Sequence, residues 1–171
     1  RRQRCPERSL HSFKRMENTD YKPYVYTGEE DPLMSKYGYF QTVVESMNPA
    51  DGLWKNHIVF NRWDPNKTHN YYFADDYPEE FKWMFNHPKH GIIAKTNKLF
   101  ERNGLKIRFN IEDAKGKKFG DLRYSFIKLI QEIDTNAPLG YGPSDANPFT
   151  GEIVAANTML WTGYLKYYLK V

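Results

Sequence analysis

The stretch from Gly140 to Trp161 constrains the fold more than any other part of the chain, because its character changes halfway along. Its first half, residues 140–151, carries three glycines and two prolines among Ser, Asp and Asn, a composition that predicts turns. In its second half, residues 153–161 alternate between two faces, neither of which is strongly polar. We therefore expect a turn-rich connection followed by a strand that protein covers on both faces.

A β-hairpin is expected earlier in the chain. Residues 39–44 and 56–63 are rich in β-branched and aromatic side chains, which favour strands. Between them lies the turn cluster at 48–52, which contains Asn48, Pro49 and Gly52. The two segments therefore predict a hairpin with a long connection.

The middle of the chain alternates between helix and strand patterns. Pro78, followed by Glu79 and Glu80, is typical of a helix start and predicts a short helix to about residue 85. A longer helix is expected over about 89–103, with Gly104 as its stop. Strands are expected at 70–73, 105–111 and 123–130. The expected fold class is α+β, with a twisted mixed sheet packed on one long helix.

Several runs of residues point to one enzyme family. Residues 140–144 read Gly-Tyr-Gly-Pro-Ser, residues 147–153 read Asn-Pro-Phe-Thr-Gly-Glu-Ile, and residues 156–158 read Ala-Asn-Thr. These runs resemble the segment just upstream of the zinc-binding helix in a group of bacterial metzincin-like zinc-dependent metallopeptidases. Other runs fit in the same order: Lys36–Phe40, Asn61–Pro65, Tyr71–Phe73 with Tyr77–Glu80, Thr96–Asn97 with Leu99–Phe100, and Gly120–Ser125.

The resemblance implies three parts: an irregular basic segment at 1–35, a β-hairpin extension at 36–66, and the N-terminal portion of a metzincin-like catalytic domain at 67–171. Zinc in this family is held by a His-Glu-x-x-His motif on a helix, whose Glu polarises the zinc-bound water. This sequence contains no such motif. We expect the zinc ligands beyond Val171, so we assign no catalytic or metal-binding residue here, and the chain alone should be inactive.

The resemblance also implies a substrate site. In metzincins the fourth strand is the edge of the sheet, and the substrate polypeptide pairs with it antiparallel through main-chain groups. We assign this role to the strand at 153–158, which comprises Ile153, Val154, Ala155, Ala156, Asn157 and Thr158. The implied partners are a polypeptide substrate and the rest of the catalytic domain, and the implied compartment is extracytoplasmic (secreted, periplasmic or envelope).

Charge and hydropathy narrow the range of partners. The formal net charge is +4, and part of it comes from a basic arm within residues 1–15. We interpret this arm as a solvated terminus and expect no nucleic acid, because no recognition helix or RNA-binding aromatic signature accompanies it. No window of about 18 apolar residues occurs, so no membrane span is expected. Cys5 is the only cysteine, which excludes an internal disulfide.

Alternative sites and an alternative function stay open. His87 and His90 have the spacing of a metal-binding pair on a helix, but Pro88 between them favours a structural role. An acidic cluster suits calcium, although a helix start explains it equally well: Asp75, Asp76, Glu79 and Glu80. The Tyr-rich segments leave room for a noncatalytic carbohydrate- or peptide-binding β-rich module.

Overall fold

The computed structural model describes residues 10–16, 19–26, 31, 32, 36, 40–132 and 138–163. Most of the basic arm, including Cys5, lies outside these ranges. A two-stranded sheet contains β1 (Gln41–Met47) and β2 (Trp54–Phe60). A six-stranded sheet contains β3 (Thr68–Phe73), β4 (Arg108–Asp113), β5 (Ser125–Ile130), β6 (Gly140–Tyr141), β7 (Ser144–Ala146) and β8 (Ile153–Trp161). The helical elements are a 3-10 turn at Glu79–Phe81, α2 (Trp83–Asn86) and α3 (Ile92–Arg102).

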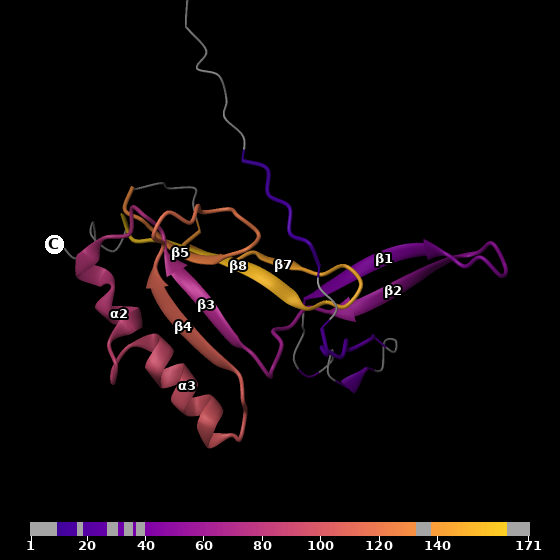
Figure 1. Ribbon diagram of the computed structural model, residues 1–171, viewed down its shortest axis with the longest axis horizontal. Coiled ribbons are helices and arrows are strands. Elements are labelled where there is room, and N and C mark those ends of the chain that lie inside the picture. The colour runs from indigo at the N-terminus through magenta and orange to yellow at the C-terminus, as the bar shows by residue number, and fades with distance from the viewer. Residues whose placement is uncertain are drawn as a thin grey trace, which may run out of the picture.

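The larger sheet is mixed, which confirms the expected fold class. Its strand order is β4-β3-β5-β8-β6, and β7 also pairs with β8. The neighbours β4, β3, β5 and β8 are parallel to one another, whereas β6 and β7 run antiparallel to β8. In Figure 1, α2 and α3 lie together beside β3 and β4, and the β1–β2 hairpin projects from the far end of the molecule.

Two connections in opposite directions decide what covers each face of this sheet. From β3 the chain passes through α2 and α3 to β4, and from β4 it returns across β3 to β5 through residues 114–124. Crossovers between parallel strands are almost always right-handed, so a reversal of direction puts the two connections on opposite faces. Ring contacts agree with this arrangement: Phe85 packs on Phe73 on the helical face, and Phe119 packs on Phe126 on the other.

The core on the helical face is aromatic and aliphatic. It is formed by five buried residues: Phe73, Tyr77, Phe85, Ile127 and Leu129. Burial raises the pKa of Tyr77 to about 12, so its hydroxyl stays protonated, and among the described residues that hydroxyl has no hydrogen-bond partner. Partly buried hydrophobic side chains such as Tyr71 and Leu160 complete the cluster.

The single long helix expected at 89–103 is not confirmed. Helix α3 begins at Ile92 and has 11 residues, after a turn in which the N–H of Gly91 donates to the C=O of His87. Ile93 and Phe100 are half-buried, whereas Ile92 and Leu99 are about half exposed. The side chains of Ile92 and Leu99 therefore face outward.

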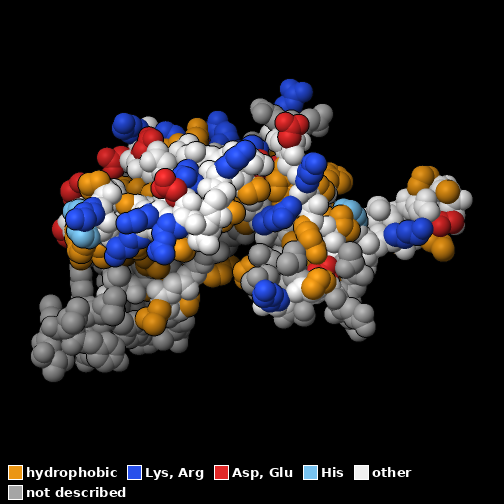
Figure 2. All heavy atoms as spheres, turned by 90° about the horizontal axis from the view of Figure 1, so that it is seen from below, with side chains coloured by type: hydrophobic (Ala, Val, Ile, Leu, Met, Phe, Trp, Pro, Cys, Tyr) orange, Lys and Arg blue, Asp and Glu red, His pale blue; other side chains and the backbone are white. Residues whose placement is uncertain are grey.

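The hairpin and the large sheet are joined through the turn at 147–151. Arg62 follows β2; its N–H donates to the C=O of Gly151, and its C=O accepts the N–H of Ile153. Lys67 bridges Asp64 and Glu152, with Nζ to carboxylate distances of 3.1 and 2.8 Å. Beyond this joint β1 and β2 extend outward, and apolar side chains gather at their far end (Figure 2), where Met47, Leu53 and Trp54 are exposed.

Asp121 holds the loop at 114–124 together. Its carboxylate accepts three side-chain hydrogen bonds from Arg123, one from Nη2 at 2.6 Å and two from Nε at 3.0 and 3.1 Å. Ser12 donates to the same carboxylate and accepts the N–H of Leu122, which ties the N-terminal segment to the loop. The side-chain and backbone hydrogen bonds from Arg123 lower the pKa of Asp121 below its ordinary 3.8.

We expect Asp121 to make stability depend on acid pH. Because its pKa is lowered in the folded state, its ionised form stabilises the fold above pH 3.8, and this contribution is lost as the pH falls through the folded-state pKa. Urea unfolding of the protein and of Asp121→Asn should therefore differ most at neutral pH and converge as the solution is acidified. The exposed Asp145→Asn should behave like the original protein, and a pH-independent difference for Asp121→Asn would contradict this account.

Candidate functional site

The expectation that residues 153–158 form the edge of the sheet is wrong. Strand β8 lies between β5 on one side and β6 with β7 on the other. Asn157 pairs with Phe126 of β5, while Ala155 and Ala156 pair with Asp145 and Ser144 of β7. A strand whose two faces are both apolar is typical of the interior of a sheet. The apolar pattern therefore agrees with the observed position of β8, and the edge position taken from the resemblance does not.

Backbone groups of the six assigned residues are already bonded within the chain. The N–H groups of Ile153, Ala156 and Asn157 donate to the C=O of Arg62, the Oγ of Ser125 and the C=O of Pro143. The C=O of Val154 accepts a hydrogen bond from Lys14, Ala155 is fully buried, and Thr158 pairs with Ile127. In the described part of the chain the buried Oδ1 of Asn157 has no hydrogen-bond partner. The main chain at 153–158 is therefore not vacant for a substrate.

The edge next to β8 is formed by β6 and β7, which behave as one strand. Gly140 pairs with Leu160 in β6, and Ser144 pairs with Ala156 in β7, in the same antiparallel register. The register shifts only after Asp145. Residues 140–145 thus form a continuous edge strand through a segment whose composition predicts turns.

This edge strand presents polar main-chain groups outward. Strand β8 donates N–H bonds to the C=O groups of Leu139 and Pro143, so these residues face β8. Antiparallel ladders alternate between residues that face the partner strand and residues that face away. The N–H and C=O groups of Gly140, Gly142 and Ser144 therefore point away from the sheet, and within the described ranges no strand pairs with that side.

Access to this edge is open. Gly142 has no heavy atom within 4 Å of the position that a Cβ would occupy, and Gly140 also lacks a side chain. Leu139 and Tyr141 are 70% and 55% exposed and can contact a ligand that lies along the strand. The chemistry available here is strand addition, in which main-chain bonds give affinity and neighbouring side chains give preference.

The opposite edge of the sheet, β4, is partly closed by a side chain. The amide of Asn97 in α3 donates to the C=O of Phe109 at 2.7 Å and accepts its N–H at 2.8 Å. At the end of β4, Asp113 pairs with Lys82. A side-chain amide that takes both polar groups of an edge residue blocks strand addition there. Of the two edges, β6–β7 is therefore the better candidate for binding an extended peptide.

The turn after β7 holds this edge in place. Asn147 is buried, and its side-chain oxygen accepts the N–H of Phe149. The N–H of Asn147 donates to the C=O of Glu152, whose carboxylate accepts a hydrogen bond from Lys67. The bond to Glu152 raises the pKa of Lys67, so the ammonium stays charged and fixes the turn to the start of β3.

The other candidate sites have structural explanations. The Nδ1 of His87 accepts the N–H groups of Lys89 and His90, which makes it part of the turn before α3. In the acidic cluster, Asp76 pairs with Lys128 and Glu79 pairs with Lys82. Among the described residues no group of three or more His, Cys, Asp or Glu side chains is placed to hold a metal ion.

The sequence carried one usable signal for the true edge. Gly140 and Gly142 lie within this short edge segment, and a glycine in a strand often marks a place where a ligand or another backbone approaches closely.

No helix within the described ranges is both long and apolar enough to cross a bilayer. Comparisons with models of protein families, with curated proteins and with solved structures find no significant match to this chain.

Proposed function

We propose that this chain is the substrate-binding upper part of a zinc-dependent metallopeptidase, and that the edge strand β6–β7 binds the polypeptide substrate. The peptide pairs antiparallel with this strand through the outward groups of Gly140, Gly142 and Ser144. The peptide then runs in the same direction as β8, which lies on the other side of the edge strand. The substrate site of this proposal is shifted by one strand from residues 153–158.

One observation carries this proposal. Counted along the chain from β3, the fourth strand is β6–β7, and this strand lies at the edge of the sheet and runs antiparallel to its neighbour. The resemblance implies an open edge at the fourth strand. An unpaired edge is otherwise a site of aggregation, so a protein that keeps one open commonly has a partner for it.

The chain's own residues supply binding and not bond cleavage. The described residues do not fit a zinc site, because they bring no set of metal-ligating side chains together. No catalytic step is therefore assigned to them. Zinc and its ligands belong to the remainder of the catalytic domain in this proposal, and the chain alone should bind an extended peptide without hydrolysing it.

Substitution of Ser144 tests the proposed edge. Ser144→Pro removes an outward N–H while leaving the pairing groups of its neighbours, whereas Ser144→Ala keeps that N–H. We expect titration of a capped octapeptide of alternating Thr and Ala, followed by amide NMR shifts, to show binding about tenfold weaker for the Pro variant and within twofold for the Ala variant. Shifts in the original protein should concentrate at 140–144 and not at β4.

Equal peptide binding by Ser144→Pro and Ser144→Ala, with both folds verified by thermal unfolding, would contradict the assignment of β6–β7 as the peptide-binding edge. Should the Pro variant unfold, alternate N-methylation of the octapeptide tests the same bonds, because it blocks one edge of the ligand. Binding without cleavage by the complete protein in the presence of zinc would favour the noncatalytic peptide-binding module over the peptidase.

A further inference from the structure

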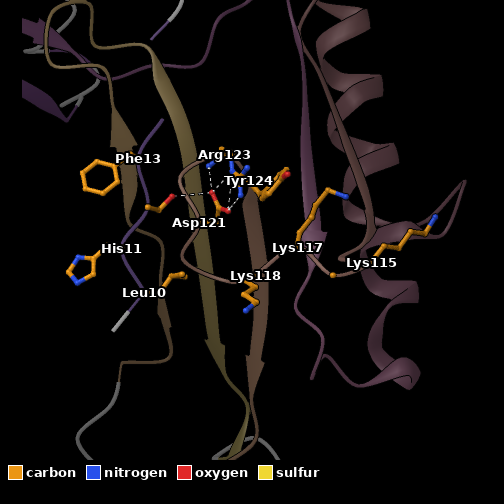
Figure 3. A pocket seen from close by; sticks show the side chains of 11 residues that line it. Leu10, His11, Phe13, Lys115, Lys117, Lys118, Asp121, Arg123 and Tyr124 are labelled. Carbon is orange, nitrogen blue, oxygen red and sulfur yellow. Dashed lines mark hydrogen bonds and ion pairs between the residues drawn. The ribbon is translucent and has the colours of Figure 1, made fainter. Parts of the chain in front are cut away.

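A broad pocket of about 520 Å³ lies on the face of the sheet opposite the helices. One wall is the N-terminal segment from Leu10 to Phe13, and the other is the loop between β4 and β5 (Figure 3). Ser12 joins the two walls through its hydrogen bonds to Asp121 and Leu122. The volume of the pocket falls in the range typical of ligand sites, about 300–1,000 Å³.

The charge of this pocket is strongly positive. Three lysines line it, Lys115, Lys117 and Lys118, and among the described residues none of them forms an ion pair. The one carboxylate in the lining, Asp121, is already bonded to Arg123 and Ser12. The three lysine charges are thus not neutralised by the pocket itself.

The loop backbone forms the turn that carries these lysines, and two tyrosines hold Lys117. Lys115 and Gly116 both have positive φ values, 48° and 84°, in a turn closed by the bond from the N–H of Lys117 to the C=O of Ala114. The ammonium of Lys117 lies 4.5 Å from the ring centre of Tyr72 and 5.5 Å from that of Tyr124. Cation–π contacts of this kind hold a charged side chain without consuming its hydrogen-bond donors.

The spacing of the lysines indicates the kind of ligand. In Figure 3 the three side chains stand apart along the loop and do not converge on one point. A single small anion could contact only one or two of them. We propose that the pocket binds a ligand that carries three or more phosphate or sulfate groups, with Lys115, Lys117 and Lys118 each contacting a different group. This site lies on a face of the sheet and is separate from the proposed peptide edge.

Two probes and a matched control variant test this proposal in the full chain. The probes are inorganic tripolyphosphate and sucrose octasulfate, titrated by calorimetry at about 50 and 200 mM salt, spanning the range in which surface charges become screened. The test variant is Lys115→Gln/Lys117→Gln/Lys118→Gln. The control variant is Lys95→Gln/Lys98→Gln/Arg102→Gln on the exposed face of α3, which removes the same charge from the other side of the sheet.

We expect the pocket variant to bind at least tenfold more weakly and the control variant to stay within twofold of the original protein. Binding of tripolyphosphate alone identifies a phosphate ligand, binding of the octasulfate alone identifies a sulfate ligand, and binding of both supports the shared chemistry. Equal weakening in the two variants, or no binding of either probe at about 1 mM, would overturn the proposal. If removal of Lys117 unfolds the loop, the double variant Lys115→Gln/Lys118→Gln serves instead, with an expected loss of about fivefold.

Discussion

Gly151→Ala should remove a large part of the stability of this fold. Gly151 has a φ of 71°, which costs an alanine about 1–2 kcal/mol. Its Cβ would also lie within 3 Å of two backbone atoms of Phe60, which cannot move without breaking the joint between the hairpin and the sheet. We expect a loss of more than about 4 kcal/mol in the free energy of unfolding, a large part of the 5–15 kcal/mol typical of a domain. Urea unfolding followed by circular dichroism measures it.

Gly104→Ala is the matched control for this prediction. Gly104 has nearly the same φ, 68°, but no heavy atom lies within 4 Å of its added Cβ. Only the conformational cost remains, so a loss of about 1–2 kcal/mol is expected. Similar losses at the two glycines would show that the contact with Phe60 does not matter and that the hairpin is not fixed to the sheet at residue 151.

The second large effect is expected at Phe126. This side chain is fully buried between the sheet and the loop at 114–124, with ring centres 6.0 Å from Tyr72 and 5.7 Å from Phe119. Phe126→Ala should cost about 4 kcal/mol, because it removes a large apolar contact and leaves a cavity. Thermal or urea unfolding measures this loss.

Phe149→Ala provides the comparison, because Phe149 is 70% exposed and should cost less than about 0.5 kcal/mol. In Phe126→Ala the loop at 114–124 should also lose protection against hydrogen exchange, since Phe119 packs on the removed ring. A loss at Phe126 no larger than that at Phe149 would contradict the packing of the loop at 114–124 on a buried Phe126.

Elements with buried faces were the ones that the sequence predicted best. The strand expected at 153–161 is β8 with the same bounds, because a strand covered by protein on both faces carries few charged or strongly polar residues on either face. The strand expected at 123–130 also formed, as β5 at Ser125–Ile130. Burial restricts the residue types along such a strand, and this restriction can be recognised in the sequence.

The edge strand could not be identified in the same way. Residues 140–146 pair on one side only, so nothing requires the β-branched or aromatic residues by which strands are identified. Gly142 and Pro143 predict a turn, and only the tertiary pairing with β8 makes the segment a strand. The edge of the sheet was therefore expected one strand too far along the chain.

The basic pocket depends on contacts that no local pattern contains. Its two walls are separated by more than a hundred positions, as the bond from Ser12 to Asp121 shows. One wall belongs to the arm within residues 1–15, which is interpreted from the sequence only as a solvated terminus. Long-range contacts between irregular segments have no periodicity, so they became visible only in the structure.

The direction and place of a bound peptide test the central claim most directly. A capped Thr-Ala octapeptide with a nitroxide label at its N-terminus should broaden the amide signals at the Ala146 end of β7, and a label at its C-terminus should broaden those at Gly140, because an antiparallel partner of β6–β7 must lie in that direction. Broadening in the reverse order, along β4, or nowhere on the sheet would contradict the account.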